Sequence, residues 1–157
     1  MRWLMHDIIF FKKGAEKMKL ESVKLPNFDD LVHEAGKKLY SLRNRLSIDS
    51  KIIGDKDASL PQDIPMECGI YAIWVNDELK YIGTIRSEQG LRGRLTEHLI
   101  NCPKGTQSKL GKVLDVVKGG GRINVSFIHV DPEPFRLALE DELIREAKPE
   151  WNQKSIR

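Results

Sequence analysis

The stretch GIYAIWVNDELKYIG, residues 69 to 83, constrains the fold more than any other part of the chain. Its first half is an almost unbroken apolar run, which is typical of a strand covered on both faces of a sheet. The segment 76–78, Asn-Asp-Glu, supplies a turn, because Asn and Asp tolerate the left-handed backbone that tight turns need. The stretch therefore predicts a β-hairpin with strands over 69–75 and 79–85.

Each strand of this hairpin carries one tyrosine, Tyr71 or Tyr81, where Ile or Val would pack without a hydroxyl to satisfy. A three-residue turn would pair Val75 with Leu79 and Ile73 with Tyr81, and both tyrosines would then share a face. A two-residue turn would send the tyrosines to opposite faces. We expect the shared face, on which the phenols are either a pair of tethered core rings or part of a site.

The remaining periodicities predict helices around the hairpin and one more strand. Apolar residues recur at helical spacing in four segments, 28–46, 91–102, 108–118 and 134–147, and Asn27 or Asp29 can cap the first of these helices. Apolar and polar residues alternate strictly over 122–130, which predicts a strand. The polar segment 47–65 is expected to be a loop. We therefore predict an α+β fold, a small antiparallel or mixed three-stranded sheet flanked by helices in the order β-β-α-α-β-α.

The chain length of 157 residues is typical of one domain with a small appendage. The helical segment and polar loop predict an N-terminal extension and linker over 1–66, and a compact domain over 67–157. Net charge is +3, but residues 84–122 carry eight basic and three acidic side chains, whereas residues 131–150 carry seven acidic and three basic ones. This asymmetry is typical of a protein that holds a polyanion and a metal cation, although two solvated helical faces of opposite sign would also produce it.

The cysteines and the N-terminus bear on localisation. Cys68 and Cys102 form no CxxC pair, which favours a reduced, intracellular setting, and a zinc site with His98 is disfavoured because a fourth ligand is missing. The apolar opening MRWLMHDIIFF is interrupted by polar residues and lacks a small-residue cleavage site, and no run approaches the roughly 20 apolar residues of a membrane span. We expect a cytoplasmic protein with no membrane partner, with Met18 as an alternative translation start.

Two helices carry polar side chains near their apolar stripes. On the last helix, Leu137, Glu140 and Ile144 share one face, so Glu140 is expected to be buried and to need a cation, a donor or a metal. A structural ion pair with an arginine is the alternative. On the helix 91–102, Arg94 and His98 lie one turn apart beside the leucines and are expected at the rim of the core.

Taken in order, these residues form a known pattern. The hairpin contains the literal triplets Gly-Ile-Tyr and Tyr-Ile-Gly, the segment LRGRLTEHL supplies an arginine and a histidine one turn apart, and LEDELIREAKPEWN supplies a glutamate and a closing asparagine. The chain thus resembles the GIY-YIG nuclease family, the catalytic domain of homing, restriction and excision-repair endonucleases, over roughly residues 67–153. It departs from the pattern at Thr84, where many members carry a lysine, and in a longer stretch before Arg94.

The resemblance implies phosphodiester hydrolysis with one divalent cation, usually Mg²⁺ with Mn²⁺ as a substitute, held chiefly by Glu140. Arg94 would be the second cation at the phosphate, since its guanidinium is always charged and grips two oxygens. Tyr71 would be the general base, with Tyr81 and His98 either orienting it or relaying the proton. Asn152 would fix local backbone or the phosphate.

The resemblance also implies DNA as the substrate. Side chains of the basic stretch expected to track the sugar-phosphate backbone are Arg86, Arg92, Lys104, Lys109 and Lys112. Basic residues of the extension are further candidates or a solvated face, namely Lys37, Lys38, Arg43 and Arg45. We expect a stand-alone endonuclease of restriction or mobile-element type, and a homodimer if both strands are cut. The alternatives are a repair-type nicking nuclease that recognises damage or DNA structure, and a catalytically silent nucleic-acid-binding module.

Overall fold

The computed structural model of the chain describes residues 18–22, 27–85, 88–102 and 108–153. Its elements follow one another as α1 (Phe28–Ser41), β1 (Leu46–Ile48), β2 (Gly69–Val75), β3 (Glu78–Ile85), α2 (Gly90–Leu99), α3 (Leu110–Lys118), β4 (Ile123–His129), α4 (Glu133–Ala147) and the 3₁₀ turn η2 (Glu150–Asn152). The fold is α+β, and the predicted order β-β-α-α-β-α is confirmed from β2 to α4. Within the described ranges, no helix is both long and apolar enough to cross a membrane.

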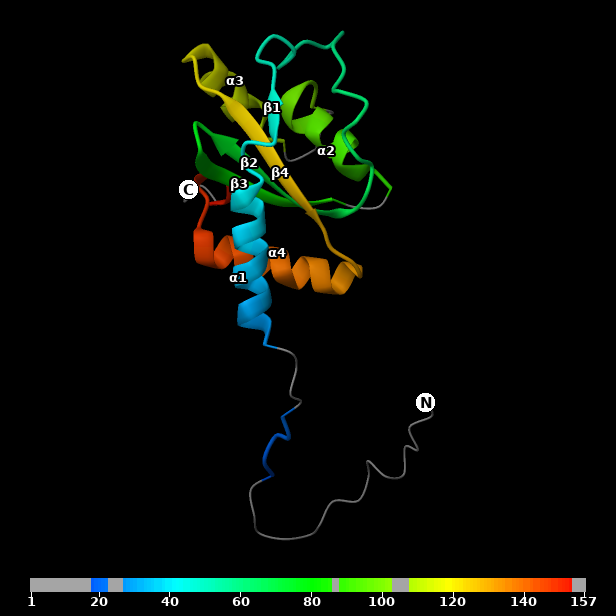
Figure 1. Cartoon of the computed structure of the whole chain (residues 1–157), viewed down its shortest axis with the longest axis vertical. Coiled ribbons are helices and arrows are strands. Elements are labelled where there is room, and N and C mark those ends of the chain that lie inside the picture. Colours follow the sequence, from blue (N-terminus) through cyan, green and yellow to red (C-terminus); the bar gives the residue numbers. More distant parts are fainter. Residues whose placement is uncertain (1–17, 23–26, 86–87, 103–107, 154–157) are drawn as a thin grey trace.

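The sheet has four strands in the order β1-β4-β2-β3, all antiparallel, instead of the three that the sequence predicts (Figure 1). The additional strand β1 pairs with the first half of β4, Leu46 opposite Val125. Helical spacing of leucines suggested a helix as far as Leu46, but α1 ends at Ser41. The edge of β4 offers hydrogen-bond partners to a segment of only three residues, which is too short to show a strand pattern of its own.

The hairpin turn has two residues, not three. Val75 pairs with Glu78, and the turn residues Asn76 and Asp77 have φ of 48° and 69°. Two consecutive left-handed residues suit the right-handed twist of the flanking strands. The predicted pairing of Val75 with Leu79 is therefore wrong.

A β-bulge corrects the register farther along the same hairpin. Trp74 pairs with Leu79, whereas the preceding residue Ile73 pairs with Tyr81, so Lys80 is the extra residue in β3. One extra residue reverses the side-chain alternation on the strand that contains it. The bulge thus restores the predicted pairing of Ile73 with Tyr81 and returns the two tyrosines to one face.

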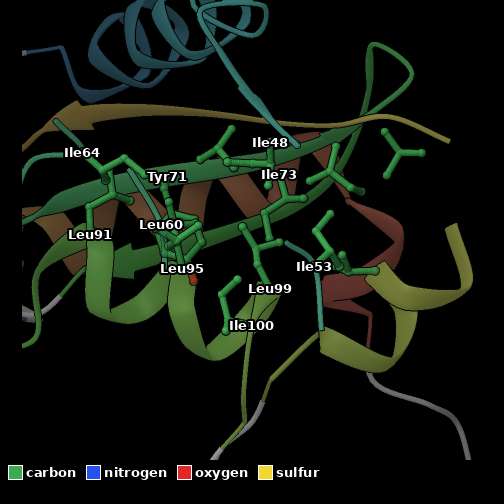
Figure 2. Packing of buried hydrophobic residues seen from close by; sticks show 14 of the residues in the cluster. Ile48, Ile53, Leu60, Ile64, Tyr71, Ile73, Leu91, Leu95, Leu99 and Ile100 are labelled. Atoms are coloured by element: carbon green, nitrogen blue, oxygen red, sulfur yellow. The ribbon is translucent and has the colours of Figure 1, made fainter. Parts of the chain in front are cut away.

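Hydrophobic clusters cover both faces of the sheet. On one face, Leu91, Leu95 and Leu99 of α2 point toward Tyr71 and Ile73 (Figure 2). On the other face, α1 and α4 pack together against the sheet. The segment expected to be an extension contributes to both clusters, through buried side chains of α1 and of residues 48–64. The domain boundary at residues 66 and 67 stays a prediction.

The buried face of α4 differs from the predicted one. Its buried residues are Arg136, Leu139 and Leu143, whereas Leu137 is 45% exposed. The spacing i, i+3, i+7 describes the predicted face and the observed face equally well. The observed face was not predicted because it begins with a charged residue, Arg136. Its guanidinium donates to a backbone carbonyl before the helix. Glu140 consequently lies half-buried beside the apolar stripe and not within it.

Candidate active site

The glycines of the two triplets leave space for close neighbours. Tyr71 pairs with Gly83 across the hairpin, and a Cβ at Gly83 would lie 2.5 Å from the Tyr71 hydroxyl oxygen. A Cβ at Gly69 would lie 2.0 Å from the carbonyl oxygen of Ile128 on β4. Both separations are shorter than a side chain tolerates. Gly83 therefore makes room for the phenol, and Gly69 makes room for the neighbouring strand.

Three rings meet on the face of the sheet covered by α2. The centroids of Tyr71 and Tyr81 are 6.0 Å apart, and the His98 ring lies 5.7 Å from Tyr71 and 5.2 Å from Tyr81. Tyr71 and His98 are fully buried. The bulge at Lys80 brings Tyr81 to this face, and the leucine stripe of α2 places His98 against the sheet. The structure therefore brings together three of the predicted site residues.

The hydrogen bonds of His98 identify its tautomer. The backbone N–H of Lys109 donates to Nδ1 at 3.0 Å, so this nitrogen carries no proton. Burial, with Arg94 and Lys109 nearby, lowers the pKa of His98 to about 3, and the ring is neutral. Its single proton is then on Nε2, which lies 2.6 Å from the Tyr71 oxygen. His98 is a donor to Tyr71.

The surroundings of Tyr71 have opposing effects on the pKa of its phenol. Burial raises the pKa of the phenol well above its ordinary value, and the neighbouring Tyr81 raises it further. The charge of Arg94 and a hydrogen bond from it lower the pKa. The phenol form dominates in this state, while Arg94 and His98 are in place to stabilise a phenolate.

Glu97 holds Arg94, a contact that the sequence analysis did not predict. The Arg94 guanidinium contacts Glu97 Oε2 at 2.5 Å, and Gln89 donates to the other oxygen of that carboxylate. Burial alone would lower the pKa of Arg94, but Tyr71 and Glu97 raise it. The available signal was the carboxylate three residues after Arg94, at the spacing of an ion pair along one helix.

Glu140 of α4 lies beside the edge strand β3. The Thr84 hydroxyl donates to Glu140 Oε2 at 2.6 Å. Burial raises the pKa of Glu140, and the hydrogen bond from Thr84 and the charge of Arg94 lower it. In the described part of the chain, no Lys or Arg makes an ion pair with this carboxylate. The alternative of a structural ion pair with an arginine therefore finds no partner there.

The donor set at Glu140 fits a hard divalent cation that keeps most of its water. No three His, Cys, Asp or Glu side chains of the described ranges gather as a metal cluster. Mg²⁺ is nevertheless bound in proteins through one or two carboxylates, with water and phosphate oxygens filling the other positions. The structure gives a zinc site at Cys68, His98 and Cys102 no support, because both ring nitrogens of His98 are engaged, one with the Tyr71 hydroxyl and the other with the Lys109 N–H.

Asn152 acts on the backbone of the same edge strand. Its Oδ1 accepts the N–H of Ile82 at 2.8 Å, and its Nδ2 donates to the Ile82 carbonyl at 2.8 Å. The amide thus replaces a neighbouring strand at this residue. Of the two roles expected for Asn152, the geometry matches the fixing of local backbone.

The predicted nucleic-acid contacts differ in their surroundings. Arg92 donates to Gln62 and to the Ile64 carbonyl, so its guanidinium ties α2 to the loop before β2. Lys109 Nζ lies 5.4 Å from the centre of the Tyr81 ring, and Lys112 is exposed on α3. Two further predicted contacts, Arg86 and Lys104, lie outside the described residues.

No protein-family model matches the chain, and no curated protein matches it. Among solved structures, it is similar to a mutant of bacteriophage T4 EndoII, with a TM-score of 0.49 and 23% identity, over 69% of this chain and 87% of that one. It is also similar to two point mutants of the GIY-YIG N-terminal endonuclease domain of UvrC from Thermotoga maritima, described as bound to a catalytic divalent cation. Each has a TM-score of 0.43, with 24% and 23% identity, and the similarity covers 59% of this chain and 89% of the domain. Both are mutants of one domain, and the family in the name of that domain is the one that the motifs of this chain resemble.

Proposed function

We propose that this chain is a divalent-metal-dependent DNA endonuclease that hydrolyses phosphodiester bonds. The observation that carries the proposal is the buried phenol of Tyr71, whose oxygen receives the Nε2 proton of His98 at 2.6 Å beside the Arg94 guanidinium. A core packed for stability alone has no need of a buried hydroxyl with a donor and a cation at its oxygen. The basic residues near this site suit a substrate with a polyanionic backbone.

Arg94 would bind the phosphate that is cut. Negative charge accumulates on a phosphodiester in its transition state, so a cation placed beforehand lowers the barrier. Glu97 and Gln89 fix the direction of the Arg94 side chain, which leaves less freedom to lose when phosphate binds. Glu140 would hold a divalent cation such as Mg²⁺, which when bound neutralises charge on the phosphate and on the departing oxygen.

Tyr71 would take the proton of the attacking water in its phenolate form. The water oxygen forms a bond to phosphorus, its proton passes to the Tyr71 oxygen, and the bond from phosphorus to the leaving oxygen breaks. His98 stabilises the phenolate by its Nε2–H and does not relay the proton, because its Nδ1 already accepts the Lys109 N–H. Tyr81 packs against both rings and limits their orientation.

The test is cleavage of supercoiled plasmid in the presence of Mg²⁺ and, separately, Mn²⁺. We expect cleavage by the wild type, and loss of cleavage with EDTA or in Glu140→Gln and Tyr71→Phe. The matched control is Glu146→Gln, which removes one exposed carboxylate from the same helix and should cleave normally. Cleavage by Tyr71→Phe at the wild-type rate would overturn the proposed base.

The products of this assay distinguish the kinds of endonuclease. Discrete linear fragments would support the restriction or mobile-element type expected from the sequence, whereas nicked circles would support repair-type action. If the wild type binds branched or damaged DNA but cuts none with either cation, the chain is a binding module and the proposal is wrong.

A further inference from the structure

The residue after the second triplet is bonded to the candidate metal ligand. Thr84 stands on the edge strand β3, and its hydroxyl donates to Glu140 Oε2 at 2.6 Å. This is the position at which the chain departs from the lysine of many GIY-YIG nucleases. The threonine that replaces this lysine therefore has a definite hydrogen-bond partner, the Glu140 carboxylate.

We propose that Thr84 is a positioning residue that fixes the Glu140 carboxylate for a divalent cation. The inference rests on the proposed function, because it concerns the same carboxylate. The Thr84 hydroxyl occupies one lone pair of Oε2, the Thr84 backbone makes a second hydrogen bond to the carboxylate, and lone pairs remain for a cation. An ammonium group at the same place would compete with the cation for that negative charge.

The need for such a partner follows from the small number of ligands. Among the described residues, no three His, Cys, Asp or Glu side chains gather around a cation position, and the acidic neighbour of Glu140 is Asp141, whose charge raises the pKa of Glu140. A single glutamate loses rotamer freedom when it is ordered, and that entropic cost opposes cation binding unless the side chain is held beforehand. Thr84 is well suited to hold it, since its hydroxyl lies on a strand and 2.6 Å from Glu140 Oε2.

The strand that carries Thr84 is itself secured close by. Asn152 binds both backbone groups of Ile82, two residues before Thr84 on the same edge. The backbone that carries the Thr84 hydroxyl is therefore held in place, and the hydroxyl can hold the Glu140 carboxylate in one orientation. A bond that served only to attach α4 to β3 would affect stability but leave the affinity for a cation unchanged, and this difference defines the test.

The test measures Mn²⁺ affinity of the full chain, by calorimetry and by the electron paramagnetic resonance signal of free Mn²⁺. Thr84→Val keeps the shape of the side chain and removes the hydroxyl, and Thr84→Ser keeps the hydroxyl. We expect affinity to fall by about 10-fold or more in Thr84→Val, the usual effect of losing a partner behind a metal ligand. Thr84→Ser should stay near the wild type. Thr96→Val is the matched control, because its hydroxyl bonds to the Arg92 carbonyl on α2 and not to Glu140.

Wild-type affinity in Thr84→Val, whatever its melting temperature, would overturn the role of Thr84. A reduced Mn²⁺ affinity of Thr84→Ser, in a protein that circular dichroism shows to be folded, would also overturn this role. The variant Glu140→Gln separates this failure from that of the proposed function. If Glu140→Gln loses Mn²⁺ while Thr84→Val keeps it, only the role of Thr84 is wrong. If the wild type and Glu140→Gln bind Mn²⁺ equally, Glu140 is not the ligand and both proposals are wrong.

Discussion

Gly83 shows how one missing side chain determines the position of a phenol. The Tyr71 ring lies over the backbone of Gly83, with the hydroxyl oxygen 2.5 Å and Cζ 2.6 Å from where a Cβ would be. The ring is fully buried, so it has no solvent to move into. A methyl group there must displace the Tyr71 oxygen from the Nε2–H of His98.

We expect Gly83→Ala to lose cleavage and to lower the free energy of unfolding by about 1 to 3 kcal/mol, the usual cost of overpacking a core. Urea unfolding and plasmid cleavage measure the two effects. Gly111→Ala on α3 is the matched control, since a Cβ there meets no atom within 4 Å. It should leave cleavage unchanged and stabilise the helix by at most about 1 kcal/mol. Normal cleavage by Gly83→Ala would contradict the proposed position of Tyr71.

His98 makes stability depend on pH because it is buried in its neutral form. Its pKa is about 3 in the folded chain against an ordinary value of 6.5, so between these values the unfolded chain binds a proton that the folded chain does not. Its stabilising contribution is full above pH 6.5 and decreases as pH falls toward 3. One proton corresponds to at most about 2 kcal/mol between pH 6.5 and pH 5.0.

We therefore expect the wild type to lose more stability than His98→Gln between pH 7.5 and pH 5.0, because the variant lacks this titrating group. Urea unfolding at the two pH values measures the difference. The control His33→Gln replaces an exposed histidine on α1 and should follow the wild type. Equal losses in wild type and His98→Gln would show that His98 is not held neutral.

At the scale of residues, the sequence predicted the motif side chains but not their partners. Tyr71, Tyr81 and His98 could be placed on one site because the triplets and the helical spacing are literal in the sequence. The partners Glu97 and Thr84 could not, since an ordinary ion pair along a helix and a strand threonine have the same local pattern wherever they occur. Only the packed fold shows which oxygen they contact.

At the scale of elements, α2 is attached to the loop before β2 by Arg92. The guanidinium donates to two groups of Gln62 and to the Ile64 carbonyl, and this use of Arg92 competes with its predicted contact to DNA. An arginine that satisfies loop carbonyls has fewer donors left for phosphate.

We expect Arg92→Ala to lower the free energy of unfolding by about 1.5 to 3 kcal/mol, as for a lost hydrogen-bonded charge. Its affinity for a DNA duplex should change little under conditions in which the variant is folded. Lys112→Ala, which removes an exposed charge from α3, should show the reverse, with normal stability and weaker DNA binding. Thermal unfolding and fluorescence anisotropy with a labelled duplex measure both quantities. A large loss of DNA affinity in folded Arg92→Ala would restore the original prediction.

The elements themselves were predictable where their patterns are long. The apolar run of β2 and the leucine stripe of α2 have that length. The hairpin turn and the bulge at Lys80 were not predictable. The turn has one residue fewer than predicted and β3 has one residue more, so the two differences cancel in the register of the strands beyond the bulge. Strand β1 and the buried face of α4 were also missed, the first for shortness and the second because Arg136 occupies a core position.

At the scale of the whole molecule, exposed lysines lie on both sides of the sheet, but only those of one side lie near the site. The rings of Tyr71 and Tyr81 lie on the face that α2 covers, with Lys109, the residue before α3, beside the Tyr81 ring and Lys112 exposed on α3. The helix α1 packs on the opposite face, and its Lys37 is exposed there. A duplex that reaches Arg94 should therefore meet the lysines of α3 before it meets those of α1.

This arrangement predicts which lysine contributes to the salt dependence of DNA binding. Each phosphate contact releases about 0.9 counterions from duplex DNA, so losing one contact reduces the slope of log K against log salt by about 1. We expect that reduction in Lys112→Ala, and no change in Lys37→Ala, which removes the same charge from the opposite face. Anisotropy titrations of one labelled duplex from 50 to 200 mM salt measure the slopes. A reduced slope in Lys37→Ala with a normal slope in Lys112→Ala would place the duplex on α1, and would assign the phosphate contacts to the N-terminal helix instead of α3.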